Sequence, residues 1–316
     1  MTSMYNAYKK LLYIKELATQ ENFSYLSTIF DCITPNTQIV NSIKFTPNLS
    51  YFHANEESLR VYIELDSFVS NKSFSNFIHY ITNTICSHHT QYIIKSLVNN
   101  MYHGCFLETT RWHDSLIIGT ELKNQQSQFR LYFPIVNTGL TTWQKLQDIM
   151  IKDCYIDLSI HDQDFVSTRQ KYGEMPVMIA IVLEKSKIVG FRIYTMQSDN
   201  ELIFCSLNKN TYVAKSFFCN IFLNYKNFFN DIYFCHSYDF DLSSNCSRSK
   251  IEFYFNDAYQ QDRILEWLLQ SKYINYINIK QNIQTISNVL NKSLKIRNIA
   301  FGLNKGLTYE SAIYLV

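Results

Sequence analysis

The sequence predicts an α+β fold in which ten antiparallel strands close into a barrel and helices surround the barrel. Three observations predict it: a strand pattern that recurs five times, a partner strand just before each copy, and helical periodicity between the strand pairs. The 316 residues include only 7 glycines and 4 prolines. So few breakers favour long regular elements joined by short polar turns.

A tyrosine at the fourth position of a short apolar segment marks each copy of the recurring strand. The segments are "LRVYI" (59–63), "FRLYF" (129–133), "FRIYT" (191–195), "IEFYF" (251–255) and "SAIYL" (311–315). Their tyrosines are Tyr62, Tyr132, Tyr194, Tyr254 and Tyr314, which lie 60 to 70 residues apart. A nearly constant period of this size predicts one supersecondary unit used five times.

Each of these strands follows a second strand across a polar turn. The preceding segments are "NSIKF", "DSLIIGTELKNQQSQ", "VMIAIVLEKSK", "YDFDLSSNCSRSK" and "IAFGLNKGLTYE". Apolar alternation on both sides of Asn, Ser, Lys and Gly turns is typical of β-hairpins. The sequence therefore predicts five hairpins, which together supply ten strands.

Between the hairpins the apolar period changes from two residues to that of a helix. Apolar residues keep helical spacing from Phe74 to Ile85 and again from Ile93 to Met101, with "CSHHTQ" as the break between two helices. Trp143 and Trp267 lie on later helical faces, where we expect them to anchor the core. The unit is thus strand, strand, helix, helix. The single domain, 1–316, divides into units at about 35–104, 105–170, 171–230, 231–292 and 293–316.

The two faces of the recurring strands differ in chemistry. One face is apolar and is expected to pack on the helices; it comprises Leu59, Val61, Ile63, Phe129, Leu131, Phe133, Val189, Phe191, Ile193, Ile251, Phe253 and Phe255. The other face carries charges and phenols: Arg60, Tyr62, Arg130, Tyr132, Arg192, Tyr194, Lys250, Glu252, Tyr254, Glu310 and Tyr314. Closing the sheet removes its edges and turns the polar face inward. The alternative is an open sheet, an interaction module whose polar face meets solvent.

Composition excludes several functional classes. The 29 basic and 27 acidic residues give a net charge of only +2 without any long basic run, which argues against nucleic-acid binding. No apolar run approaches the roughly 18 to 20 residues that a membrane span needs. The N-terminal pattern is amphipathic rather than that of a secretory signal. Eight cysteines without a CxxC pair indicate reduced thiols in a cytoplasmic protein.

An inner face of arginines and tyrosines suits an anion beside a cation. Buried guanidinium groups are costly unless they are paired or bind an anion, and arginine with lysine is the usual partner of phosphate groups. Tyrosine faces attract cations. Such a face could ionise an allylic diphosphate, with basic groups on the leaving group and rings around the carbocation.

These features resemble those of the ABBA-type prenyltransferases, and most of all the cyanobactin-type peptide prenyltransferases. The resemblance spans roughly residues 35 to 316 and is carried by "GTELKNQQSQFRLYFPI" (119–135), "FDLSSNCSRSKIEFYF" (240–255) and "FGLNKGLTYESAIYLV" (301–316). It implies an ABBA barrel that transfers a dimethylallyl or geranyl group from its diphosphate to a nucleophilic side chain of a ribosomal, macrocyclic peptide.

The resemblance also implies roles for individual residues. The diphosphate ligands would be Arg60, Arg130, Arg192 and Lys250. The carbocation shield would be Tyr62, Tyr132, Tyr194, Tyr254 and Tyr314. Glu64, Glu252 and Glu310 are candidates for the general base or for ion pairs with the inner cations. Apart from the resemblance, Asp239 and Asp241 in "YDFDL" alternate on a strand and could hold a magnesium diphosphate complex through water. No organic cofactor is expected, because the prenyl diphosphate is a co-substrate.

One position departs from the family pattern. The family carries a glutamate on its first strand, and the comparable segment here, "QIVNSIKF" (38–45), has Val40 at that place. Either the correspondence slips, or the base comes from elsewhere on the inner face, or the acceptor is not a phenol. The acceptor residue, the attacking atom and the donor length therefore stay open.

Two further functions remain open. Within the same fold, the acceptor could be a small free aromatic compound. In another class, the barrel could bind an amphipathic anionic ligand without catalysis, since the same arginines would serve. The segments "CSHHT" (86–90) and "RWHDS" (111–115) contain potential metal ligands, but neither has zinc spacing.

Overall fold

The structure of the chain is a computed structural model. It covers residues 43–52, 56–65, 79–80, 82–103, 116–123, 126–135, 142–159, 164–184, 186–197, 212–229, 233–243, 246–255, 261–271, 279–304 and 309–315. For β1, β2 and β3 it describes the backbone without the side chains.

Ten strands form the sheet. In chain order they are β1 (Ile43–Phe52), β2 (Glu56–Leu65), β3 (Leu116–Lys123), β4 (Gln126–Pro134), β5 (Glu174–Glu184), β6 (Lys187–Gln197), β7 (Tyr233–Asp241), β8 (Cys246–Tyr254), β9 (Ile296–Asn304) and β10 (Tyr309–Leu315). All five predicted hairpins are present as consecutive antiparallel pairs.

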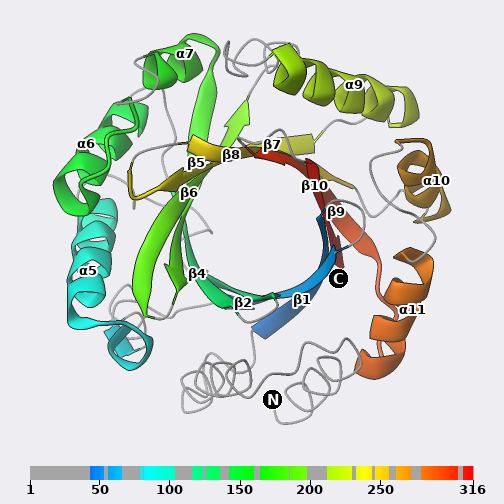
Figure 1. The fold of residues 1–316 in the computed structure, drawn as a ribbon, viewed down its shortest axis with the longest axis horizontal. Coiled ribbons are helices and arrows are strands. Elements are labelled where there is room, and N and C mark those ends of the chain that lie inside the picture. The colour runs from blue at the N-terminus through cyan, green and yellow to red at the C-terminus, as the bar shows by residue number, and fades with distance from the viewer. Residues whose placement is uncertain are drawn as a thin grey trace.

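The sheet closes on itself into a barrel (Figure 1). Each strand pairs with its neighbours in the chain, and the first strand also pairs with the last, so that Asn48 on β1 lies opposite both Arg60 on β2 and Tyr314 on β10. Closure gives every strand two hydrogen-bonded neighbours and leaves no edge exposed. The predicted closed barrel is confirmed, and the open-sheet alternative is wrong.

Helices form a ring around the barrel (Figure 1). The described helices are α5 (His88–His103), α6 (Thr142–Cys154), α7 (Phe165–Lys171), α9 (Tyr212–Phe228), α10 (Gln261–Ser271) and α11 (Ile279–Leu290). The break predicted at "CSHHT" is present: helical residues 82–85 end there, and the Ser87 hydroxyl accepts a hydrogen bond of 3.3 Å from the backbone N–H of Thr90 at the start of α5. His88 and His89 are exposed.

The main hydrophobic core lies between the barrel wall and the helices. Alternate residues of β4, β6 and β8 enter it, including Phe129, Leu131, Phe133, Phe191 and Phe253, all at most 1% exposed. The predicted apolar face of β4, β6 and β8 therefore packs on the helices, and its members on β2, Leu59, Val61 and Ile63, have side chains outside the described part of the structure. Trp143 and Trp267 are both fully buried in this core, as expected for anchors.

One predicted core position is wrong. Val182 pairs with Gly190 while the next residue, Leu183, pairs with Ile188, so Val189 is bulged out of the ladder. Ile188 takes its place in the core. A Cβ on Gly190 would lie 2.5 Å from the carbonyl oxygen of Phe240 on β7, so β6 and β7 lie too close at this point for any side chain. Simple alternation along the sequence does not reveal a bulge.

A buried polar cluster joins α7 to the outer wall of the barrel. Glu174, at the start of β5, accepts hydrogen bonds from the hydroxyls of Thr195 and Tyr238, the second at 2.8 Å. His236 Nδ1 lies 3.5 Å from Glu174 Oε1, and Arg169 Nε lies 3.9 Å from Oε2. Burial alone would raise the pKa of Glu174, but these partners outweigh burial and lower it to about 2.

The cysteines within the described ranges are thiols and not disulfides, as the sequence predicts for this part of the chain; they are Cys86, Cys154, Cys219, Cys235 and Cys246. None of the helices in the described ranges is long and apolar enough to span a membrane.

Candidate functional site

The inner face of the barrel holds a second, smaller cluster of buried residues. Tyrosines and small residues from β4 to β10 make it up: Tyr132, Ala180, Tyr194, Cys235, Ala300, Ala312 and Tyr314, with Tyr254 packed against them. Strand alternation separates these residues from the outer core, because neighbours in sequence point to opposite faces. Four of the five predicted shield tyrosines thus meet inside the barrel.

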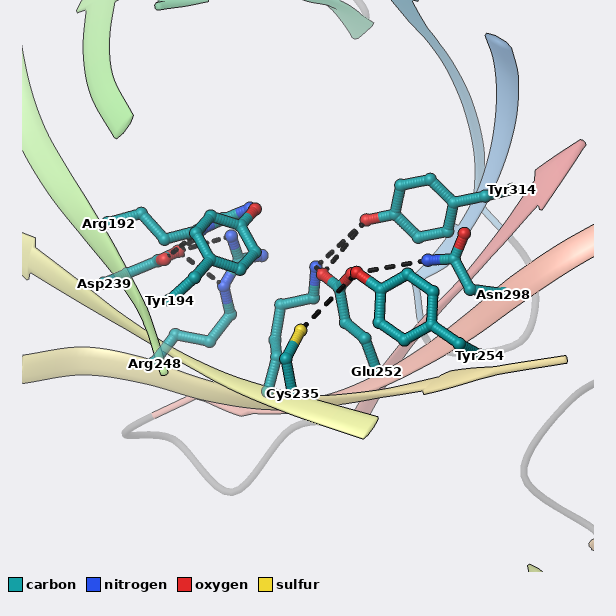
Figure 2. Close-up of polar contacts among 10 residues, drawn as sticks. Arg192, Tyr194, Cys235, Asp239, Arg248, Glu252, Tyr254, Asn298 and Tyr314 are labelled. Carbon is teal, nitrogen blue, oxygen red and sulfur yellow. Dashed lines mark hydrogen bonds and ion pairs between the residues drawn. The ribbon is translucent and has the colours of Figure 1, made fainter. Parts of the chain in front are cut away.

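Arg192 and Arg248 both bind the carboxylate of Asp239 (Figure 2). The strand register explains the contact, since Asp239 on β7 lies directly opposite Arg192 on β6 and Arg248 on β8. Arg192 donates from Nε to Oδ1 and from Nη2 to Oδ2 at 2.7 Å, and Arg248 Nε donates to Oδ2 at 2.8 Å. The Arg192 side chain is 0% exposed and that of Asp239 is 17% exposed, so the guanidinium of this bidentate pair is fully buried.

Arg130 completes what we call the arginine group, defined as Arg130, Arg192, Arg248 and Asp239. Burial would raise the pKa of Asp239, but the charges of the three arginines together hold it well below its usual range. Arg130 is 4% exposed, and its Nη2 donates a hydrogen bond of 3.0 Å to the side chain of Gln128. Three cations and one carboxylate leave this group with a net charge of +2.

Two of the tyrosines border the arginine group. Arg192 Nη1 donates a hydrogen bond of 3.2 Å to the hydroxyl of Tyr194. The rings of Tyr132 and Tyr194 lie 6.0 Å apart between centroids, tilted by 51°. The predicted neighbourhood of basic groups and aromatic rings is therefore present on β4 and β6.

A second set of contacts centres on Glu252; we call it the lysine group, defined as Lys250, Glu252, Tyr254, Asn298 and Tyr314 (Figure 2). Lys250 Nζ, Tyr314 Oη and Asn298 Nδ2 each donate to the Glu252 carboxylate at 3.3 Å, and Tyr254 Oη donates at 3.4 Å. Lys250 Nζ also lies 3.4 Å from the Tyr314 hydroxyl. Glu252 thus has the ion pair that the sequence suggested as one of its two roles.

Tyr254 and Cys235 remain protonated inside the barrel. Burial, followed by the electrostatic effects of the neighbouring Cys235 and Glu252, raises the pKa of Tyr254 well above its usual value. Burial followed by the charge of Glu252 likewise raises the pKa of the Cys235 thiol. The Cys235 sulfur lies 3.6 Å from the Tyr254 hydroxyl. Tyr254 is therefore a neutral hydrogen-bond donor at neutral pH.

Several predicted residues cannot be placed as side chains. Arg60, Tyr62 and Glu64 lie on β2 and Glu310 lies on β10, but their side chains are outside the described part of the structure. Val40 also lies outside the described residues. Arg60 is paired through its backbone with Glu121 on β3 and Asn48 on β1.

The predicted magnesium carboxylates have other partners. Asp239 is held by two arginines, and Asp241 Oδ1 accepts a hydrogen bond of 2.9 Å from the backbone N–H of Ser243. Across the described ranges, three or more His, Cys, Asp or Glu side chains nowhere converge as a metal site would need. Magnesium bound through water and the diphosphate stays a prediction.

Sequence reasoning missed Arg248, Gln128 and Asn298. Arg248 alternates with Lys250 and Glu252 on the same strand, so its place on the inner face could have been read from the sequence. Asn298 shows no such signal, because β9 is otherwise lined inward by Ala300 and Gly302. Only the register of β8 against β9 brings its amide to Glu252.

Solved structures with the same architecture share little sequence with this chain. 5-dimethylallyltryptophan synthase from Streptomyces coelicolor matches with a TM-score of 0.65 at 8% identity, covering 99% of this chain and 96% of that one. AnaPT from Neosartorya fischeri gives 0.62 at 10% identity, covering 98% and 91%. The barrel is the ABBA prenyltransferase fold. NotF prenyltransferase, solved also with brevianamide F and DMSPP, gives 0.62 at 10% identity over 86% of this chain and 80% of its own.

Sequence comparisons add nothing to this ABBA fold. No protein-family model matches the chain, and no curated protein matches it. Because the structural likeness lies near 10% identity, it establishes the fold and leaves the subfamily open. The cyanobactin type stays a prediction.

Proposed function

We propose that this chain is a prenyltransferase that transfers an allylic group, dimethylallyl or geranyl, from its diphosphate to a nucleophile. The observation that carries the proposal is the arginine group beside Tyr132 and Tyr194, inside a barrel of the ABBA fold. Three guanidinium groups with one carboxylate give the positive charge that a departing diphosphate needs. The fold is shared with structures described as a prenyltransferase and a dimethylallyltryptophan synthase.

The proposed reaction is dissociative. The bond between the allylic carbon and the diphosphate oxygen breaks, and its electron pair leaves with the diphosphate held by Arg130, Arg192 and Arg248. The inner tyrosines shelter the carbocation until the acceptor supplies an electron pair to it. The acceptor then loses a proton, which Glu252 accepts. Glu252 is the one predicted base whose side chain lies within the described residues.

The acceptor we propose is a side chain of a ribosomal, macrocyclic peptide, in line with the cyanobactin-like pattern of the strands. A second candidate is a free indole or other small aromatic compound. It is favoured by the neighbours, whose descriptions name dimethylallyltryptophan and brevianamide F. Both acceptors would be alkylated by the same cation, so the identity of the prenylated product distinguishes them.

A product assay tests the activity and the acceptor together. The purified chain is incubated with dimethylallyl or geranyl diphosphate and a panel of cyclic peptides, linear peptides, tryptophan and indole, and products are analysed by mass spectrometry for added prenyl mass. Prenylated cyclic peptide supports the first proposal, and prenylated tryptophan or indole supports the second. If diphosphate binds but no acceptor is alkylated and no diphosphate is hydrolysed, the barrel is a non-catalytic binder.

Calorimetry with inorganic pyrophosphate tests the site itself. Arg130→Ala and Arg248→Ala are each expected to weaken binding by about tenfold or more, because each removes a charged hydrogen-bond donor. Arg263→Ala is the matched control, since Arg263 is an exposed arginine on α10. Unchanged affinity in both inner variants would refute the placement of the diphosphate.

A further inference from the structure

Ser237 carries a buried hydroxyl that belongs to neither the arginine group nor the lysine group. The residue is 1% exposed, and its Oγ has no hydrogen-bond partner among the residues that the structure describes. Buried hydroxyls in native proteins are nearly always paired, so an unpaired one calls for an explanation. A ligand that arrives from outside the protein is the simplest.

Strand alternation places this hydroxyl on the inner face. Ser237 lies on β7 between Asp239, which belongs to the arginine group, and Cys235, which contacts the lysine group at Tyr254. These two neighbours occupy the two separate sets of contacts in Figure 2. Residues two apart on a strand share a face, so Ser237 points inward between both sets.

The register across the sheet agrees with this position. Ser237 lies opposite Tyr194 on β6 and opposite Lys250 on β8. The hydroxyl of Tyr194 is engaged with Arg192, and Lys250 is engaged with Glu252 and Tyr314. The tyrosine and the lysine on either side of Ser237 thus each have a partner, while the serine hydroxyl between them has a proton to donate.

We propose that Ser237 is a further diphosphate-binding residue, whose hydroxyl donates a hydrogen bond to a non-bridging oxygen of the prenyl diphosphate between the arginine group and Lys250. The inference rests on the proposed function. A diphosphate offers many acceptor oxygens over a short span, and the arginine group supplies the charge that brings it there. Ser237 adds a neutral donor at the one inner position between the two sets of contacts that β7 can reach.

Replacing Ser237 by alanine is expected to weaken pyrophosphate binding without lowering the stability of the free protein. Ser237→Ala removes a hydrogen bond to a charged group, and we expect pyrophosphate affinity to fall by about tenfold or more. In the free protein the same change removes an unpaired buried polar atom, so the midpoint of thermal unfolding should stay the same or rise. A serine kept only for structure would show lower stability and unchanged affinity.

Titration calorimetry with inorganic pyrophosphate and thermal unfolding are measured on the full chain for four proteins. These are the wild type, Ser237→Ala, Ser237→Cys and Ser249→Ala. Ser237→Cys keeps the volume but offers a weak donor, and should lose affinity as the alanine variant does. Ser249 lies on β8 opposite Tyr238 and points to the outer face. The Ser249→Ala variant should therefore bind pyrophosphate as the wild type does.

The outcomes separate this inference from the proposed function. A wild-type chain that binds no pyrophosphate overturns both. If the wild type binds pyrophosphate and prenylates an acceptor while Ser237→Ala binds equally well, only the role of Ser237 is refuted. A loss of affinity accompanied by lower unfolding temperature in Ser237→Ala also refutes it, because the serine would then be supporting the barrel wall. Weaker binding at equal or higher stability supports it.

Discussion

Arg192 and Asp239 form a bidentate ion pair across neighbouring strands inside the barrel, with Arg192 Nη2 and Asp239 Oδ2 2.7 Å apart. Arg192 is fully buried, and burial would disfavour its charge, yet the pair with Asp239 raises its pKa well above the usual value. The carboxylate therefore keeps a guanidinium charged and oriented inside the protein before any anion arrives. It acts as an internal counter-ion for the cations proposed to bind diphosphate.

Removing this counter-ion should destabilise the protein. Asp239→Asn leaves Arg192 buried without its carboxylate, and we expect a loss of about 3 kcal/mol in the free energy of unfolding. Urea denaturation measures the loss. The control is Asp241→Asn, which lies on the same strand and face, and should change stability by less than about 1 kcal/mol. Added pyrophosphate should recover part of the loss, and equal stability of the two variants would contradict the role of Asp239.

Glu252 is expected to act in the transfer step as well as in the lysine group. Glu252→Gln keeps a hydrogen-bond acceptor for Asn298 and the tyrosines but cannot take a proton at neutral pH, so kcat should fall by about 100-fold or more. The KM for the diphosphate should change much less, because the arginine group is untouched. Steady-state kinetics with the acceptor found in the product assay would show this split.

The control for Glu252 is Glu266→Gln, an exposed glutamate on α10. Its kinetics should match those of the wild type. Should Glu252→Gln raise KM while kcat stays the same, the carboxylate would serve only to position Lys250.

Glu174 should make stability depend on acidic pH. Its pKa falls from an ordinary 4.5 in the unfolded chain to about 2 in the folded protein. A lowered pKa contributes stability that is fully present above pH 4.5 and is lost as pH falls toward 2. The shift corresponds to roughly 3 kcal/mol at neutral pH. Glu174→Gln should therefore be less stable than the wild type at pH 6.

Urea denaturation at pH 6 and pH 3 tests the sign. The gap between the wild type and Glu174→Gln should narrow by about 2 kcal/mol at the lower pH, since most of the interval between the two pKa values has then been crossed. Glu266→Gln should keep a constant, small difference from the wild type. A gap that stays constant or widens on acidification would show that Glu174 gains nothing from its neighbours on the outer wall.

Two buried thiols should resist alkylation in the folded protein. Burial raises the pKa of Cys86 to about 12, and burial with the charge of Asp153 does the same for Cys154. At pH 8 the reactive thiolate is then on the order of one part in ten thousand. Iodoacetamide labelling followed by peptide mass spectrometry should modify both residues far more slowly than the partly exposed Cys219. In guanidinium chloride all three should react alike, and equal rates in the native protein would contradict their burial.

The alternation of apolar and polar residues along the strands allowed the barrel to be predicted from the sequence. The five tyrosine-marked strands with their partners predict ten strands, and the split between Phe129/Leu131 and Arg130/Tyr132 predicts which face turns inward. The pairing of individual charges was not readable in the same way. Asp239 meets Arg192 and Arg248 because of the register between three strands, and register depends on turns and bulges that a single sequence does not specify.

Bulges explain the errors and omissions. The bulge at Val189 shifts the inward and outward phase by one residue. Arg248 lies opposite Asp239 in the regular register of β7 and β8, and this register shifts just beyond the pair, where Phe240 lies opposite Cys246. Asn298 and Ser237 are ordinary polar residues in sequence, and become notable only beside the strands that face them. The alternation of apolar and polar residues thus predicted the strands of the barrel, whereas the partners of each inner side chain could be found only from the three-dimensional structure.

A sheet without a first or last strand gives its inner positions a rotational equivalence. Any strand of the barrel can direct a side chain toward the barrel axis. A carboxylate on one strand can therefore be replaced by a carboxylate on another strand without a change in the backbone of the barrel. The proposed base, Glu252, comes from β8, far along the sequence from Val40.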